Sequence, residues 1–266
     1  MKASVLVRAK DEAEHIGQVL EIVRNQTVDA ELIVVDSGST DGTGDIAREH
    51  GANVIWIPAE SFTFGGSLNT GTQAATGDIV VALSAHAFPR DDRWLERMLA
   101  PFEDERVACA CGADAGPQGE PLDGLVYQDE ELARRFPYWG YSNAAGAYRR
   151  SLWEQYRFRP EMPGTEDKEW SWHWIMRGMV CVLGPELTVE HDHTKDPIRE
   201  TWVRARREWI GFAMYLDLDK LALGDAFTQW RRESRQYRHP MNVLREGVRV
   251  AGEWSVRRDG RRFASS

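Results

Sequence analysis

The fold class of this chain is decided by Leu32-Ile33-Val34-Val35-Asp36-Ser37-Gly38-Ser39-Thr40-Asp41-Gly42-Thr43. The first four residues form an apolar run of strand length. The next eight are glycine, acidic or hydroxylated, a composition typical of a loop. A helical pattern follows to about Glu49. The stretch therefore predicts a buried strand that ends in a polar turn and continues into a helix.

The same alternation of strand and helix occupies roughly the first 110 residues. A further helix is expected to open at Asp11, because Glu14 stands three residues on in a capping-box-like arrangement. Alternation at this spacing predicts βαβ units in a mostly parallel sheet, whose ligands bind beyond the carboxyl ends of the strands. The other expected strands are residues 4–7, 54–57, 79–83 and 143–148, and the other helices 66–75, 91–102 and 166–177.

Composition limits the possible classes of protein. The chain has 266 residues, of which 42% are hydrophobic, and a formal net charge of −9. Its length fits one large α/β domain or two domains. The acidic balance argues against a nucleic-acid partner, since such proteins normally present a basic surface. No apolar run approaches the ~18 residues of a membrane span, and the first residues lack the shape of a signal peptide.

The three cysteines, Cys109, Cys111 and Cys181, favour a reducing compartment without a disulfide framework. A cytoplasmic protein is therefore expected. Cys109 and Cys111 would share one face of a strand. A metal pair or simple apolar packing can explain this spacing, and packing is favoured.

The charge is unevenly distributed along the chain. Residues 231–266 contain ten Arg against four Asp or Glu, a local balance of +6, so residues 1–230 carry −15. Apolar residues interleave with these arginines, which predicts an amphipathic helix rather than a disordered tail. Three uses stay open: a contact with the acidic part of the chain, a subunit contact, or a dock for an anionic or membrane-linked acceptor.

Five motifs together resemble the family 2 glycosyltransferases with the GT-A fold, in their rhamnosyltransferase-like branch. The resemblance covers about residues 3–215. It implies a GT-A domain over 1–215, with a nucleotide-binding half at about 1–112, an acceptor half at about 113–215, and a basic helical extension over 216–266. The motifs are Val7-Arg8-Ala9-Lys10-Asp11-Glu12, the segment from Val35 to Thr43, Phe62-Thr63-Phe64-Gly65-Gly66 with Asn69, Leu83-Ser84-Ala85-His86 with Pro89, and Gly164-Thr165-Glu166-Asp167-Lys168-Glu169-Trp170.

The resemblance implies a site for a nucleotide-sugar donor. Asp36 is expected to be exposed at the sheet edge and to contact the base or ribose, although Asp36 and Asp41 can also simply brace their turn. Glu12 either lies near the base or complements a helix dipole. The implied donor-binding residues are Arg8, Ala9, Glu12, Asp36, Ser37, Gly38, Gly65, Gly66, Ser84 and Ala85.

The metal site of the family has no complete counterpart here. Most members carry an Asp-x-Asp-like motif where this chain has Ser84-Ala85-His86, without a carboxylate. We expect His86 and His191 to meet at the donor diphosphate, with a divalent cation, Mn²⁺ or Mg²⁺, between them. Two alternatives are direct donation from imidazolium to phosphate and a purely structural histidine.

The resemblance places the general base in the pair Glu166-Asp167. Inverting transfer is an in-line displacement, and a carboxylate takes the proton of the acceptor hydroxyl. Asp167 is the expected base, with Glu166 orienting donor or acceptor; the alternative is that both carboxylates complement a helix N-terminus. Tyr138, Trp139 and Tyr141 are either an acceptor platform or buried packing.

The sequence therefore predicts an inverting, nucleotide-sugar-dependent glycosyltransferase. The alternative is a sugar-nucleotide-binding protein of the same fold without catalysis; a sugar-1-phosphate nucleotidyltransferase would need a Gly-rich loop that residues 8–16 lack. UDP-, dTDP- and GDP-sugars are possible donors. Saccharide, lipid-linked and secondary-metabolite acceptors stay open, as do a homodimer and a peripheral contact with the inner face of the membrane.

Overall fold

The computed structural model describes residues 1–191, 197–237 and 239–258. The chain forms two compact units. The first, here called the α/β unit, comprises Met1–Glu161 and Asp167–His191. The second, here called the helical unit, comprises Met162–Glu166 and Asp192–Ser266. The expected division fell after residue 215, whereas the structure groups the helix before that point with the helices after it.

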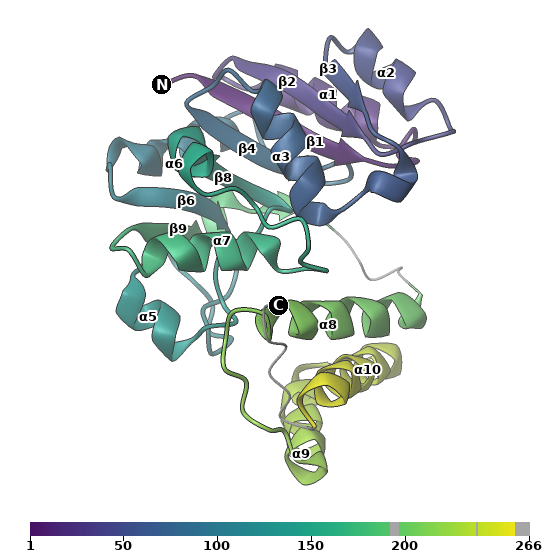
Figure 1. The fold of residues 1–266 in the computed structure, drawn as a ribbon, viewed down its shortest axis with the longest axis vertical. Coiled ribbons are helices and arrows are strands. Elements are labelled where there is room, and N and C mark those ends of the chain that lie inside the picture. The colour runs from purple at the N-terminus through teal and green to yellow at the C-terminus, as the bar shows by residue number, and fades with distance from the viewer. Residues whose placement is uncertain (192–196, 238, 259–266) are drawn as a thin grey trace. The chain divides into compact units, whose positions relative to one another are not determined.

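An eight-stranded sheet forms the centre of the α/β unit (Figure 1). Six of the strands run in one direction, while β7 and β8 run against their neighbours. The mostly parallel sheet is confirmed. In spatial order the strands are β3 (Asn53–Trp56), β2 (Ala30–Asp36), β1 (Ala3–Ala9), β4 (Ile79–Ser84), β8 (Ala145–Arg149), β6 (Val107–Gly112), β9 (Val180–Gly184) and β7 (Val126–Gln128).

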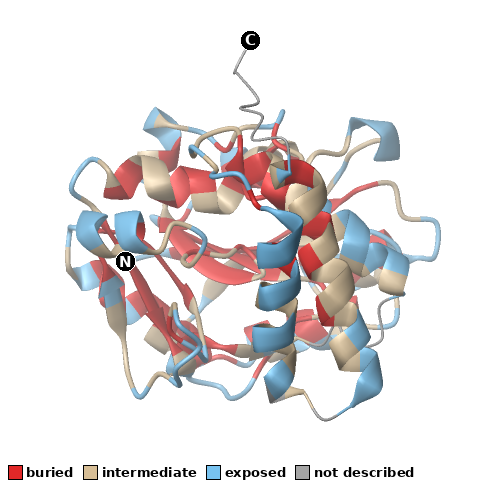
Figure 2. Cartoon of the chain, turned by 90° about the horizontal axis from the view of Figure 1, so that it is seen from below, coloured by how far each residue is buried: buried red, intermediate tan, exposed pale blue. Residues whose placement is uncertain are grey.

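Apolar cores cover both faces of this sheet. Val5 and Val7 of β1 belong to one core, together with residues of α1 and α4, while Leu6 belongs to the other, with residues of α3 and α7. The strands are accordingly buried while the helices keep exposed outer faces (Figure 2). The helices of the unit are α1 (Ile16–Arg24), α2 (Thr43–Glu49), α3 (Phe64–Ala74), α4 (Trp94–Leu99), α5 (Glu130–Arg135), α6 (Arg150–Gln155) and α7 (Glu166–Ile175), whose first residue belongs to the helical unit.

The prediction that a helix opens at Asp11 is wrong. The helix α1 begins at Ile16, and Asp11 has a positive φ of 52°. The Asp11 carboxylate accepts a hydrogen bond from the backbone N–H of Thr40 at 2.9 Å, and the Asp11 N–H donates to Ser39 Oγ at 2.9 Å. Asp11 therefore binds the loop after β2 rather than capping a helix, because a tertiary contact satisfies it better.

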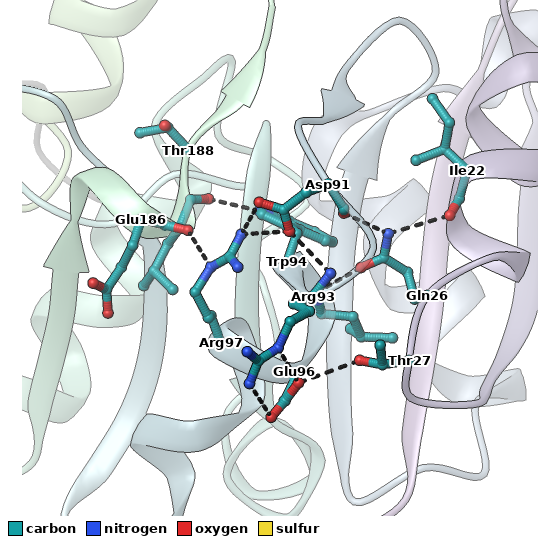
Figure 3. A network of polar contacts seen from close by, with 12 residues as sticks. Ile22, Gln26, Thr27, Asp91, Arg93, Trp94, Glu96, Arg97, Glu186 and Thr188 are labelled. Atoms are coloured by element: carbon teal, nitrogen blue, oxygen red, sulfur yellow. Dashed lines mark hydrogen bonds and ion pairs between the residues drawn. The ribbon is translucent and has the colours of Figure 1, made fainter.

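A polar network fixes the segment after β4 (Figure 3). Gln26 at the end of α1 accepts from the Leu95 N–H and donates to the Asp91 carbonyl, both at 2.9 Å. Arg97 of α4 binds the Asp91 carboxylate and donates to the carbonyl of Glu186. These bonds hold the residues around two short paired strands, β5 (Phe88–Pro89) and β10 (Val189–Glu190).

Three helices dominate the helical unit: α8 (Ile198–Phe212), α9 (Leu223–Glu233) and α10 (Pro240–Arg257). Trp209, Phe212 and Val256 pack in a small core between α8 and α10. A Cβ on Gly252 of α10 would lie 3.0 Å from that of Ala205, so the two helices approach closely. Within the described ranges, every helix is too short or too polar to cross a bilayer.

Candidate functional site

A hollow of about 210 Å³ lies at the carboxyl ends of β1, β2 and β4. Open α/β sheets bind ligands at this edge. The hollow brings together five of the expected donor-binding residues, which come from loops far apart in the sequence. Its lining consists of Arg8, Ala9, Lys10, Glu12, Ser37, Phe62, Phe64 and Ser84.

Hydrogen bonds between two loops build one wall of this hollow. The Glu12 N–H donates to Thr43 Oγ1 at 2.8 Å, and the Ala13 N–H donates to the Asp41 carboxylate at 2.9 Å. Bonds from Thr43 and Ala13 lower the pKa of Asp41. Asp41 therefore braces its turn, one of the two roles that its sequence allowed, and the wall is fixed before any ligand arrives.

The neighbours Asp36 and Ser37 differ in what they offer a ligand. Asp36 was expected to be exposed, but it is only 4% exposed, and its carboxylate accepts the Ser39 N–H at 2.9 Å. Ser37 is also buried, yet it lines the hollow, and its Oγ has no hydrogen-bond partner among the residues that the structure describes. A buried hydroxyl without a partner is costly, so Ser37 is suited to bind a polar ligand group.

The segment before α3 supplies two aromatic rings to the hollow. Phe62 and Phe64 lie edge to face with ring centroids 5.1 Å apart, and Arg8 Cζ lies 5.7 Å from the Phe64 ring centroid. The adjacent glycines differ from expectation: the Gly66 N–H donates to Thr63 Oγ1, and a Cβ on Gly65 would lie 2.7 Å from the carbonyl oxygen of Arg159. Both glycines thus serve close packing, and neither lines the hollow.

Phe62 and Phe64 line the hollow, but neither is among the donor-binding residues predicted from the sequence. The signal in the sequence that points to them is the motif Phe62-Thr63-Phe64-Gly65-Gly66, in which both stand. Gly38, another expected donor contact, has a φ of +78° and lies against Ala59. It provides a left-handed turn, a conformation that side-chain-bearing residues rarely adopt.

The structure places His86 beside His191. Pairing of β5 with β10 brings the two segments together, and the rings stack with centroids 4.9 Å apart and planes 27° apart. His86 Nδ1 lies 2.8 Å from the Glu12 carboxylate, and its Nε2 lies 3.4 Å from Ser84 Oγ. Ala85 is buried. The neighbouring His193 lies outside the described residues.

The fit of this pair to a divalent cation is partial. Across the described ranges, no three His, Cys, Asp or Glu side chains converge on one point as a complete metal site would require. The contact between Glu12 and His86 Nδ1 is nevertheless the arrangement that orients a metal-binding imidazole. Among the described residues, the two stacked histidines therefore supply at most a part of a cation site.

Asp167 lies in the first turn of α7 and is partly exposed. Its carboxylate accepts the Asn143 N–H at 3.0 Å and the Lys168 N–H at 2.8 Å. Ala144, which follows Asn143 in the chain, accepts a hydrogen bond on its carbonyl oxygen from the Ser84 N–H at 2.9 Å. These bonds tie Asp167 to the carboxyl end of β4, the strand that also delivers Ser84 to the hollow.

Glu166 belongs to the short segment Met162–Glu166 of the helical unit and is buried. Thr165 has a φ of 62°, a strained conformation for a β-branched residue. A Cβ on Gly211 of α8 would lie 2.1 Å from the Gly164 carbonyl oxygen, so α8 presses directly on this turn. Burial lowers the pKa of Arg207, and the Glu166 carboxylate is among the charges that oppose this shift.

The three aromatic residues before β8 have different roles. Tyr141 is fully buried, its hydroxyl donates to Asn143 Oδ1 at 2.8 Å, and burial raises its pKa. Trp139 donates to the Ala115 carbonyl at 3.0 Å. Tyr138 is exposed and is the one of the three that suits a surface platform.

The buried thiols and a second hollow do not compete with this site. Cys109 of β6 pairs in register with Cys181 of β9, and burial raises the pKa of both thiols, which favours packing over metal binding. A hollow of about 620 Å³ contains Ala30 and Asn53. These residues begin β2 and β3, so the hollow lies at the amino ends of the strands.

Comparisons with known proteins decide the family. The model of "Glycosyl transferase family 2" matches residues 4–172. The chain belongs to this family. It is 31% identical over 186 residues to the O-antigen chain rhamnosyltransferase WbaN of Salmonella anatum, covering 64% of this chain and 59% of WbaN. It is 25% identical over 217 residues to the rhamnosyltransferase RfbN of Salmonella typhimurium, covering 75% and 69% of the two chains.

Solved glycosyltransferases share the fold of this family 2 chain. Mannosyltransferase PcManGT of Pyrobaculum calidifontis, solved with GDP-Man and Mn²⁺, superposes with a TM-score of 0.65 at 19% identity, over 96% of this chain and 72% of that one. Glucosyl-3-phosphoglycerate synthase of Mycobacterium tuberculosis, solved with Mn²⁺, UDP and glucosyl-3-phosphoglycerate, gives 0.57 at 22% identity, over 79% and 77%. The GT-A fold is confirmed.

Proposed function

We propose that this family 2 glycosyltransferase moves a sugar from a nucleotide-sugar donor to an acceptor hydroxyl, with inversion at the anomeric carbon. One observation carries the proposal. The edge of the sheet that holds the hollow with the unpartnered Ser37 hydroxyl also holds the partly exposed Asp167 carboxylate. A nucleotide site and a general base at one sheet edge are the two parts that this chemistry needs.

Asp167 would act as the general base. The acceptor oxygen attacks the anomeric carbon, its proton passes to the carboxylate, and the bond from the anomeric carbon to the diphosphate oxygen breaks. The two backbone N–H groups on Asp167 keep the carboxylate in place and leave it partly exposed. Glu166 would position the start of α7 rather than contact substrate, since it is buried in the turn under α8.

The donor would bind with its nucleoside in the hollow. Ser37 Oγ would bond a base or ribose group, and Phe62 and Phe64 would cover an apolar ring. Arg8 and Lys10 are the cations in the lining and would offset the charge of the diphosphate leaving group. The acidic balance of residues 1–230 makes such local cations necessary.

A divalent cation, Mn²⁺ or Mg²⁺, is part of the proposal. His86 and His191 would hold it, and the Glu12 carboxylate would orient His86. When bound, the cation would offset the negative charge of the diphosphate. Support comes from the Mn²⁺ in the related solved structures.

For the transferred sugar and the acceptor, we propose only a chemical class. WbaN and RfbN are described as O-antigen chain rhamnosyltransferases, which favours a deoxyhexose or hexose as the transferred sugar and a saccharide as acceptor. The chain spans 59% of the length of WbaN, so any shared substrate is itself a proposal.

The test is a time course of nucleoside diphosphate release from UDP-, dTDP- and GDP-sugars with saccharide acceptors. Acceptor-dependent release with an inverted product anomer is expected. Donor binding without release from any donor–acceptor pair would favour the alternative, a sugar-nucleotide-binding protein without catalysis. Chelation followed by addition of Mn²⁺ tests the cation: unchanged turnover and unchanged donor affinity would contradict it.

A further inference from the structure

Helices α9 and α10 present an apolar hollow of about 270 Å³ on the helical unit. Leu223, Phe227 and Trp230 line it from α9, where their spacing places them on one face, and Val250 and Trp254 line it from α10. Leu223 is 67% exposed and Phe227 is 54% exposed. Apolar residues gathered in this way usually mark an interaction site.

The packing of the two helices fixes this apolar face. The Trp230 indole N–H donates to the Val243 carbonyl at 3.1 Å, so the ring is held across α10. A Cβ on Gly247 would lie 3.1 Å from that indole nitrogen, and the glycine therefore allows the close approach. The aromatic rings are held in place by the folded unit and are not part of a loose tail.

The exposed charges near the apolar face are mostly cationic at the end of α9 and along α10, whereas the first turn of α9 carries the exposed Asp225. Glu233 and Glu246 both pair with Arg249, and Glu253 pairs with Arg257. These are all the acidic residues of positions 231–258, so every carboxylate of this stretch is held in an ion pair. Arginines are exposed beside the apolar residues: Arg231 follows Trp230, and Arg258 Cζ lies 5.5 Å from the Trp254 ring centroid.

We propose that this face docks the protein on a bilayer surface rich in anionic lipid. Leu, Phe and Trp side chains on one face with arginines beside them are the features of helices that lie in the membrane interface. The arginines would meet lipid phosphates while the apolar side chains enter the acyl boundary. Docking goes beyond glycosyl transfer and does not depend on it.

The same charges argue against a second copy of the chain as the occupant. A symmetric dimer through this face would bring two arginine rims together, and like charges oppose such an interface. An anionic surface is the complement of this rim. The apolar side chains alone would allow either partner, and the charges decide between them.

The test is co-sedimentation of the full chain with vesicles of phosphatidylcholine, with or without phosphatidylglycerol, at low and high salt. We expect binding only to the anionic vesicles, weakened by salt. Leu223→Ser with Phe227→Ser should reduce binding at least about tenfold. Trp56→Ser is the matched control, because Trp56 is 58% exposed on β3 of the α/β unit, and this variant should bind as the parent does.

A charge reversal separates the electrostatic part. Arg231→Glu should weaken binding about fivefold or more, while Arg24→Glu should not; both arginines are exposed in the last turn of a helix. Equal binding to neutral vesicles, no binding, or unchanged binding of the Leu223/Phe227 double variant would overturn the proposal. So would a dimer that this double variant dissociates. Nucleoside diphosphate release with a soluble acceptor should persist in these variants. Failure of the parent protein to release nucleoside diphosphate would count against the proposed transfer reaction and not against docking.

Discussion

In the α/β unit, short polar side chains at the strand ends bond to the backbone of neighbouring loops, as Asp11 does with Thr40 and Asp41 with Ala13. In the helical unit, long side chains pair with each other between helices, as Arg249 of α10 does with Glu233 of α9. Backbone bonds fix loops around a concave site. Ion pairs between helices leave apolar side chains such as Phe227 facing outward.

The difference between the two units shows where each kind of function is located. A hollow whose walls are set by loop-to-loop bonds can hold a small polar ligand with little reorganisation. A fixed apolar face with a cationic rim suits an extended surface instead. The segment 162–166 is the link, since α8 of the helical unit presses on it and Asp167 of the α/β unit follows it in the chain.

The largest expected effect is that of Asp167→Asn. Asparagine keeps the size of the side chain and can accept one of the two backbone N–H bonds, but it cannot take a proton. Turnover should therefore fall on the order of 10²-fold or more while donor affinity is retained. Steady-state rates and a donor titration measure the two quantities. Turnover near that of the parent would remove Asp167 from the role of base and break the assignment of chemistry to the α/β unit.

Gly211→Ala tests whether the helical unit supports that chemistry. The new Cβ would lie 2.1 Å from the Gly164 carbonyl oxygen, so we expect a loss of about 1–3 kcal/mol in the free energy of unfolding and lower turnover. Gly224→Ala is the control, because nothing lies within 4 Å of its added Cβ, and it should be neutral or stabilising. Equal stability of the two variants would mean that α8 does not hold the turn.

A smaller effect concerns the stability of the α/β unit in acid. Burial and the charge of Arg177 lower the pKa of His173 to about 4 from its ordinary 6.5. The unfolded chain then binds the proton more readily, so this stability is complete above pH 6.5 and declines as the pH falls toward 4. His173→Phe should keep the ring stack on Tyr156 and remove on the order of 1 kcal/mol of this dependence, a value discounted for partial exposure.

Thermal unfolding of both proteins over this pH range measures the difference. At about pH 8 the parent and the variant both carry an uncharged ring, so their stabilities should be close there. Parallel curves across the acidic range would show that His173 does not report on the unit's stability.

Local patterns were enough to predict the parallel sheet and much of the hollow. The strands after which Arg8, Ser37 and Ser84 stand are continuous apolar runs, and the fold rule then places their ends together. What failed depends on contacts between distant residues. The start of α1 and the burial of Asp36 follow from hydrogen bonds made by loop residues. The close packing of Gly211 against Gly164 brings together residues that lie 47 positions apart in the sequence.

The central claim is that a nucleotide binds where β1, β2 and β4 end, and two buried serines test it most directly. Ser37 has no partner for its hydroxyl in the described structure, whereas Ser4 of β1 binds Glu31 at 2.6 Å and accepts the Gly77 N–H. The measurement is titration of nucleoside diphosphates into Ser37→Ala and Ser4→Ala, with unfolding followed in parallel. We expect Ser37→Ala to weaken binding about tenfold at unchanged stability, and Ser4→Ala to lose about 1–2 kcal/mol of stability at unchanged affinity. Unchanged affinity in Ser37→Ala, or no binding by the parent protein, would contradict the account.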